Sequence, residues 1–435
     1  MRNLGKTDEK IDSPIKEQDI FLKLSKLFFA LFLLYSGWFQ FVFFQISNMS
    51  LLLGAGMMLF IIFHSLLHKN PVSNLVTAEI AVWILFAFTS LLTGFFVAVN
   101  ADLLLEAIKT FMQYLIMISG VVYISSKDKK IDYFINVYFL FSLTCAISTL
   151  TSGVYYSSIR ISMSETTNPN LLGLTMVIGI FCILYKINFK STVPTIFYFC
   201  GLFLLFYIII LTGSRKSFLG AAGLIALWLI FVSRDVIKSA SRHIIRNLLI
   251  FMLIILAGGY LFFLSISNSS MLLRLEDFMN TGNETRISMY AVAVEIFMRS
   301  PLFGVGLDNY RAVAGFSTYS HSTYAEIIAC TGIIGTTLYF IPYLNQAKKI
   351  LRLIRIKDIY ISVHAKLLGI LFVILIFLGT GVIHFYDTNS YIAFSFTIAF
   401  YNIYGLKLKD QKAEGEKYEQ IAISEKSIKT NQGFR

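Results

Sequence analysis

The chain has 435 residues, of which 56% are hydrophobic and only 14% are charged. Soluble domains carry about 25% charged residues, so this composition excludes an ordinary soluble protein and indicates an all-α, polytopic membrane protein. The formal net charge of +12 does not by itself point to nucleic acid, because basic residues in a membrane protein first report its topology. We expect no nucleic-acid partner.

The N-terminal segment, residues 1–24, is polar and has neither the short apolar region nor the small-residue cleavage site of a signal peptide. We expect it to form a cytoplasmic tail. The four cysteines fall within apolar stretches and lack CxxC or Cys/His spacing, so we interpret them as small core residues rather than metal or redox ligands.

Apolar stretches long enough to span a bilayer, about 20 residues each, recur along the chain. We predict about twelve transmembrane helices, nine of them within residues 25–265 and three within residues 323–406. The stretches lie at 25–46, 48–67, 75–97, 108–125, 131–150, 171–187, 194–212, 217–233, 247–265, 323–344, 362–383 and 390–406.

The distribution of lysine and arginine predicts the orientation. If both termini are cytoplasmic, that side holds 29 of the 37 Lys and Arg residues, as expected from the excess of basic residues in cytoplasmic loops. The opposite side then holds Lys109, Arg160, Arg215, Lys216, Arg274, Arg286, Arg299 and Arg311. Six of these eight outer cations are arginine.

One outer connection, residues 266–322, is much longer than the others, and long loops in compact proteins are usually functional. Its apolar residues at positions 287, 290, 291, 294 and 297 or 298 have the spacing of an amphipathic helix, which Pro301 ends. We expect this helix to lie along the membrane surface or to cap a cavity. Residues 407–435 are charged and poor in large apolar side chains, which predicts a disordered cytoplasmic tail.

Two of the outer arginines are predicted at helix N-termini. Arg215 begins the eighth span and Arg286 lies in the first turn of the loop helix, where the helix dipole disfavours a cation by about 0.3 to 1 kcal/mol. A bound anion offsets this cost, and the planar guanidinium is suited to binding phosphate oxygens in a bidentate manner. The alternative is that Arg215 and Lys216 only extend toward lipid headgroups.

A third cation precedes the segment Asn168-Pro169-Asn170. Proline in the first turn after asparagine is a helix-start signal, so this segment at least caps the sixth span. Arg160 lies shortly before it and adds a positive charge at the same outer rim.

His321 is predicted at the outer mouth of the tenth span, again at a helix N-terminus, where the dipole favours neutral imidazole. A neutral histidine can accept a proton, although a lone histidine at a membrane boundary can also be an interfacial hydrogen-bonding residue. The nearby arginines favour the first interpretation. Candidates for the acceptor site or the cavity wall are Glu326, which does not share the face of His321 closely, and Asn170, His384 and Asp387.

Three segments carry a family resemblance: "TGSRKSFLG", then "TRISMYAVAVEIFMRSPLFGVGLDNYR", then "HSTYAEIIACTGIIG". Their order resembles that of the O-antigen ligase and polymerase family of bacterial membrane proteins, over residues 200–340. In that family a proline and two glycines precede a histidine that opens a helix, followed by a glutamate and a glycine pair. The corresponding residues here are Pro301, Gly304, Gly306, His321, Glu326, Gly332 and Gly335.

The resemblance implies a glycosyltransferase of the bacterial cytoplasmic (inner) membrane that needs neither metal nor cofactor. Its donor is an oligosaccharide on undecaprenyl diphosphate in the outer leaflet, so membrane lipid and an acceptor glycan are the other expected partners. Arg215, Arg286 and Arg160 are then expected to bind the diphosphate. His321 is expected to take the proton from the acceptor hydroxyl. The chain also lacks an Asp-x-Asp motif.

Three functions remain open. A surface-polysaccharide polymerase is favoured, because nothing in the sequence points to a different acceptor. A ligase that transfers the glycan to the lipid A core or to a wall polymer uses the same chemistry. A polysaccharide transporter or flippase is disfavoured, because there is no internal repeat and no charged residue deep in the spans apart from Glu79.

Overall fold

The computed structural model describes residues 15–43, 46, 48–68, 75–157, 160–165, 167–187, 191–238 and 284–405. The expected span at 247–265, most of the 1–24 tail, the start of the long loop at 266–283 and the 407–435 tail lie outside these residues.

Helices make up most of the described chain. They are α1 (Ile15–Leu34), the π-helix η1 (Tyr35–Phe39), α2 (Gln40–Val42), α3 (Met49–Leu67), α4 (Ala78–Val97), α5 (Ala101–Asp128), α6 (Asp132–Ser152), α7 (Pro169–Lys186), α8 (Thr192–Leu211), α9 (Arg215–Phe231), α10 (Ser233–Lys238), α13 (Glu284–Arg299), α14 (Tyr310–Val313), α15 (Thr323–Ile354), α16 (Ile359–Leu378), the 3-10 turn η3 (His384–Tyr386) and a helix at 388–405. Between α6 and α7, strands β1 (Val154–Ser157) and β2 (Arg160–Ser162) form an antiparallel hairpin that the sequence patterns did not predict.

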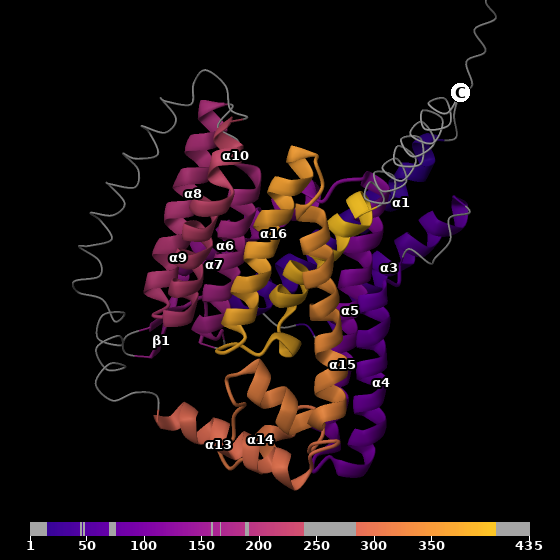
Figure 1. The fold of residues 1–435 in the computed structure, drawn as a ribbon, viewed down its shortest axis with the longest axis vertical. Helices are drawn as coiled ribbons and strands as arrows, with labels where there is room; N and C mark the ends of the chain where they lie inside the picture. The colour runs from indigo at the N-terminus through magenta and orange to yellow at the C-terminus, as the bar shows by residue number, and fades with distance from the viewer. Residues whose placement is uncertain are drawn as a thin grey trace, which may run out of the picture.

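The long helices form one bundle, with α13 and α14 across one end (Figure 1). Within the described ranges, nine helices are long and apolar enough to cross a membrane. The shorter α9 packs in the same bundle, against α7 and α16. The prediction of an all-α, polytopic membrane protein is therefore confirmed.

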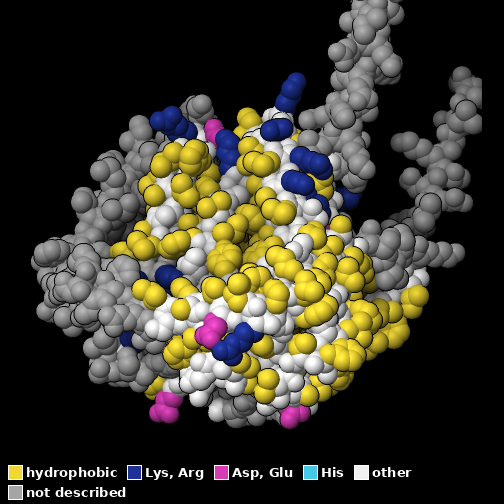
Figure 2. Space-filling model, turned by 60° about the horizontal axis from the view of Figure 1, so that its bottom comes forward, with side chains coloured by type: hydrophobic (Ala, Val, Ile, Leu, Met, Phe, Trp, Pro, Cys, Tyr) yellow, Lys and Arg dark blue, Asp and Glu magenta, His cyan; other side chains and the backbone are white. Residues whose placement is uncertain are grey.

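The surface of the bundle is unlike that of a soluble protein. Large apolar side chains such as Phe96, which is 90% exposed, project from its flanks. In Figure 2 hydrophobic side chains cover much of the visible surface, while Lys and Arg side chains gather mainly along the upper rim. A belt of this extent is compatible with lipid around it, because large exposed apolar surfaces in water favour association.

The core is aromatic and centres on the helix at 388–405. Its Tyr391 and Phe394 pack against Trp83 of α4, and all three are buried. The indole Nε1 of Trp83 donates a 3.2 Å hydrogen bond to the carbonyl oxygen of Tyr339 in α15. This bond satisfies the polar atom of the buried ring and ties α4 to α15.

The amphipathic helix expected in the long loop corresponds to α13. Its buried side chains include Met289, Ala293 and Ile296, and α13 packs against α15. Ile287 and Val294, two residues of the expected apolar stripe, are instead exposed. The helix is thus apolar on more than one side, with one apolar side toward the bundle and another directed away from it.

Candidate functional site

The tenth expected span, 323–344, is not one straight helix. Gly332 interrupts α15 with φ 59° and ψ −163°, and the helix continues to Ile354. The segment at 323–331 is therefore a separate helical segment between His321 and the longer part of α15. Sequence periodicity missed this break because both segments are apolar and in helical register.

The loop that follows α13 fills the break. The amide of Ile333 donates to the carbonyl oxygen of Pro301 at 2.9 Å, and the amide of Gly306 donates to that of Cys330 at 2.9 Å. A Cβ atom on Gly332 would lie 2.4 Å from the backbone of Leu302. Glycine is needed here because two backbones touch and φ is positive.

Glycine is needed at Gly304 for the same two reasons, on the loop side of this contact. Its φ is +67°, and an added Cβ would lie 2.4 Å from the backbone of Cys330. The proline and glycine positions of the family motif thus dock the loop after α13 onto the broken helix. This docking fixes where α15 begins, and with it the position of His321.

His321 has a strained backbone. Its φ is +59°, in the left-handed region that non-glycine residues rarely adopt, and such strain costs about 1 to 3 kcal/mol where the surrounding structure imposes it. Ser322 caps α15 by accepting from the amide of Ala325, and the amide of Thr323 donates to the carbonyl oxygen of Gly379 at 2.8 Å. The two residues after His321 are held by these bonds, so the imidazole is presented by a constrained turn.

Three cations from three elements act on the His321 ring: Arg160 of β2, Lys216 of α9 and Arg286 of α13. Burial and the positive charges of these three residues lower the pKa of His321 to about 4. The ring is therefore neutral near pH 7, as the sequence position predicts, and one of its nitrogens can accept a proton. Arg215, the first residue of α9, lies close enough to Lys216 for the two charges to repel.

Two of these cations, Arg160 and Lys216, donate to neutral oxygen atoms. Arg160 donates from Nε to the carbonyl oxygen of Thr212 and from Nη2 to Oδ1 of Asn170, both at 2.9 Å. Lys216 donates from Nζ to the carbonyl oxygen of Thr380, which also accepts from the hydroxyl of Tyr290 at 3.1 Å. Neutral acceptors orient a cation without cancelling its charge, so the site keeps a positive potential.

Tyr319 supports the imidazole from one side. Its ring packs edge-on against His321 with centroids 4.5 Å apart, and its hydroxyl accepts a 2.8 Å hydrogen bond from Nδ2 of Asn168. Asn168 also caps α7 by accepting from the amide of Asn170. The cap of the sixth span is therefore connected to His321 through one aromatic ring.

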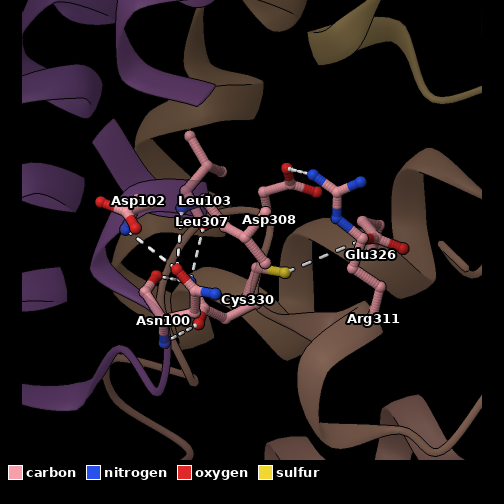
Figure 3. A network of polar contacts seen from close by, with 9 residues as sticks. Asn100, Asp102, Leu103, Leu307, Asp308, Arg311, Glu326 and Cys330 are labelled. Atoms are coloured by element: carbon pink, nitrogen blue, oxygen red, sulfur yellow. Dashed lines mark hydrogen bonds and ion pairs between the residues drawn. The ribbon is translucent and has the colours of Figure 1, made fainter. Parts of the chain in front are cut away.

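Glu326 does not line an open cavity. Its side chain is fully buried, and Oε2 accepts a 2.6 Å hydrogen bond from the amide of Ser320, the residue before His321. Its Oε1 accepts a weak contact from Sγ of Cys330, as Figure 3 shows. The family glutamate thus anchors the turn that presents the histidine.

The polar network in Figure 3 continues to the junction of α4 and α5. Oδ1 of Asn309 accepts from the amide of Asn100 at 2.7 Å, and its Nδ2 donates to the carbonyl oxygens of Asn100 and Leu307 at 3.1 Å. Asp308 forms an ion pair with Arg311. The "GVGLDNYR" segment therefore attaches the long loop to the start of α5 by hydrogen bonds. Its sequence alone did not indicate this role.

His384 and Asp387 have their polar atoms engaged by residues of their own loop and of the two helices that flank it. The ring nitrogens of buried His384 contact Oγ of Ser390 at 2.6 Å and the carbonyl oxygen of Leu375 at 2.7 Å. Asp387 accepts from the amide and hydroxyl of Ser390 at 2.7 and 2.6 Å. This geometry is typical of structural residues that shape the turn before the helix at 388–405.

The structure thus brings Arg160, Arg286 and His321 together, and places Asn170 against Arg160 rather than against the imidazole. Lys216 joins them, although the sequence analysis did not include it among the expected diphosphate-binding residues. Its place next to Arg215 in "TGSRKS" was the available signal. In the described part of the chain, no group of three or more His, Cys, Asp or Glu side chains is arranged to hold a metal ion.

A comparison with protein-family models matches residues 200–340 to the family described as O-antigen ligase. A search of curated proteins gave no match. The matched residues include α9 with Arg215 and Lys216, and α13 with Arg286. They also include His321, which lies in the turn before α15. The description of the matched family is that of a glycan-processing enzyme. Over residues 200–340 the chain is therefore similar to the O-antigen ligase family, as its sequence motifs indicate.

Proposed function

We propose that this chain is an integral-membrane glycosyltransferase that polymerises oligosaccharide repeat units on the outer face of the bacterial cytoplasmic membrane. The donor carries its glycan on undecaprenyl diphosphate, and the acceptor is a second lipid-linked glycan. The observation that carries the proposal is the convergence of Arg160, Lys216 and Arg286 on one neutral histidine. Such a site favours an anionic ligand, and the diphosphate of the donor supplies one.

The proposed reaction is a displacement at the anomeric carbon. The acceptor hydroxyl oxygen attacks this carbon while the bond from the carbon to the diphosphate oxygen breaks. Undecaprenyl diphosphate leaves with the electron pair, and His321 takes the hydroxyl proton. A glycosidic bond forms, and no oxidant, reductant or nucleotide takes part.

The cations have a separate role, because negative charge grows on the diphosphate as it leaves. Arg215, Arg286 and Arg160 are proposed to bind its oxygen atoms, and Lys216 adds a fourth charge. Fixed cations in a partly buried site stabilise such a leaving group without reorganisation. We therefore propose that the transfer does not depend on a metal ion.

This proposal requires the α13 end of the bundle to face outward, with twelve spans and both termini in the cytoplasm. The prediction is tested with cysteines placed at exposed positions, Glu295→Cys on α13 and Lys357→Cys between α15 and α16. In intact cells a membrane-impermeant maleimide is expected to label only the first. Labelling of only the second would place the cation site on the cytoplasmic face and reject the proposal.

A ligase remains the alternative, because the matched family carries that description and the chemistry is the same. The two differ only in the acceptor, which is a repeat unit on lipid for a polymerase and a different surface carrier for a ligase. A transporter is the second alternative. It would move lipid-linked glycan between leaflets of a vesicle without forming a new glycosidic bond.

The decisive test is His321→Ala in purified protein in lipid, supplied with a diphosphate-linked donor in the presence of EDTA. General-base catalysis contributes about 10²- to 10⁴-fold, so we expect transfer to fall by at least two orders of magnitude. In cells, single lipid-linked repeat units should accumulate.

The matched control is His364→Ala, because His364 lies near the start of α16, whereas Gly379, just after the end of α16, accepts from Thr323 near His321. Its transfer is expected to equal that of the wild type. Normal transfer by His321→Ala would show that the histidine is structural, and a requirement for divalent metal would show that the cations alone do not neutralise the leaving group.

A further inference from the structure

Helix α5 carries a polar face within an otherwise apolar span. Glu106, Lys109, Thr110 and Gln113 are spaced at i, i+3, i+4 and i+7, so their side chains lie on one side of the helix. Polar residues in a transmembrane helix almost always face the bundle interior or a water-filled cavity. None of the four takes part in the contacts around His321 described above, so this face needs a separate explanation.

These four residues line a cavity of about 330 Å³, called the polar pocket here. Its opposite wall comes from the π-helix η1 and the residues after it, including Ser36, Gln40 and Asn48. The volume lies at the lower end of the range for small-molecule sites. π-Helical turns are rare and often occur at functional sites, and here the turn directs Ser36 and Gln40 to the same cavity.

The hydrogen-bonding groups of the pocket are partly free. In the part of the chain that the structure describes, the buried hydroxyl of Ser36 has no hydrogen-bond partner. Nζ of Lys109 donates to Oδ1 of Asn48 at 2.9 Å, and Nε2 of Gln40 donates to the carbonyl oxygen of Ser36 at 2.6 Å. Buried polar atoms usually have a partner, so a polar ligand is the natural complement to this wall.

The charge of the pocket differs from that of the cation site. It holds one carboxylate, Glu106, and one ammonium group, Lys109, and its other polar side chains are neutral hydroxyls and amides. A carboxylate repels an anionic headgroup but accepts hydrogen bonds from hydroxyl groups. Amides such as Gln113 both donate and accept, as do sugar hydroxyls. This set is therefore matched to an uncharged ligand rich in hydroxyl groups.

A single loop connects the pocket to the cation site. The hydroxyl of Tyr114, which lines the pocket, donates to the carbonyl oxygen of Tyr386 at 2.9 Å. The same loop carries Thr380, whose carbonyl oxygen accepts from Lys216. Both sites are thus attached to the connection between α16 and the helix at 388–405.

We propose that the polar pocket binds sugar residues of an uncharged oligosaccharide, at a distance from the bond that is formed in the reaction. The assignment of this glycan as the substrate's repeat unit rests on the proposed function. The presence of a sugar site does not, because it follows from the pocket's own side chains.

The test uses Thr110→Cys in a Cys200→Ser background, because the other three native cysteines are buried. A water-soluble maleimide labels Thr110→Cys in purified protein in lipid. The probe is the free oligosaccharide released by mild acid from the lipid-linked glycan of the producing cells. We expect it to slow labelling at least tenfold at saturation, and equally in the presence of His321→Ala.

Two controls define the site. Asp102→Cys, exposed at the start of α5, should label at the same rate with and without the probe. Adding Gln113→Leu and Glu106→Gln to the Thr110→Cys protein should raise the protecting concentration at least tenfold, with an unchanged melting temperature. Absence of protection, or equal protection by glycerophosphoglycerol, would overturn the proposal. Loss of transfer in His321→Ala with protection intact separates this pocket from the catalytic proposal.

Discussion

The two ends of the bundle use their cations differently. At the end away from α13, lysines are paired with carboxylates at 2.6 to 2.7 Å, and the charges cancel within the protein. These pairs are Lys26–Asp128, Lys186–Asp132, Lys349–Glu79 and Lys366–Asp235.

At the His321 end, Arg160 and Lys216 donate to carbonyl and amide oxygens, and with Arg286 they impose a positive potential on the imidazole. The difference teaches that net charge alone is a poor guide to an anion site. The four lysines at the first end are paired with carboxylates. At the second end Arg299 and Arg311 are also paired, but the positive charges of Arg160, Lys216 and Arg286 act on the imidazole.

The largest effect is expected from Arg286→Lys and Arg215→Lys. Lysine keeps the charge but loses the planar fork, so bidentate contacts to phosphate oxygens are lost. A charge-assisted hydrogen bond contributes about 1.5 to 3 kcal/mol, which corresponds to about a 10- to 100-fold loss in the rate of transfer if the bond tightens in the transition state. The measurement is kcat with a purified diphosphate-linked donor.

Arg299→Lys is the matched control, because Arg299 lies on the same helix as Arg286 but is exposed and paired with Glu295. It should retain full activity. If Arg286→Lys and Arg215→Lys also retain full activity, the two arginines act only through their charge or as headgroup anchors. The proposal that they bind phosphate oxygens in a bidentate manner would then be wrong.

Much of this architecture could be predicted because its signals are local. Helix α7 begins at Pro169 after the Asn168 cap, and α9 begins at Arg215 after Ser214, both within a few residues of the expected spans. Hydrophobic length and capping residues act over one or two turns, so a single sequence is enough to read them. The same signals placed Arg215 and Arg286 at helix N-termini.

The rest depends on contacts between distant segments. The break at Gly332 is stable because the loop after Pro301 satisfies the exposed backbone groups, and Lys216 reaches the site because the carbonyl of Thr380 accepts from it. Neither contact has a local sequence signal. For the same reason His384, which looked like a candidate for the cavity wall, has both ring nitrogens engaged by partners in its own region of the fold.

A smaller effect is expected in the pH dependence. Burial and the nearby cations lower the pKa of His321 to about 4, below the ordinary 6.5, so the free enzyme keeps its base neutral down to about pH 4. The acid limb of kcat/KM should therefore lie near pH 4. A bound diphosphate offsets the cations and raises this pKa, so the acid limb of kcat should lie at higher pH.

Lys216→Gln sharpens this measurement, because it removes one of the three charges that lower the pKa of His321. The acid limb of kcat/KM should move up from pH 4 toward 6.5, while Lys366→Gln at the opposite end should leave it in place. An acid limb that does not respond to Lys216→Gln would mean that another group titrates.

The smallest effect is expected from Lys366→Met, at the end where charges cancel. The Lys366–Asp235 pair spans 2.7 Å, but both side chains are about one-third exposed, at 31% and 32%. Such pairs contribute about 1 kcal/mol or less, so the apparent melting temperature should change by about 2 °C or less. Transfer should not change, because this lysine is at the end of the bundle opposite His321.

Lys366→Arg keeps the charge and should match the wild type in both measurements. A loss of transfer in Lys366→Met as large as that in Arg286→Lys would mean that positive charge at either end supports the reaction, and the cations around His321 would then have no special role as an anion site.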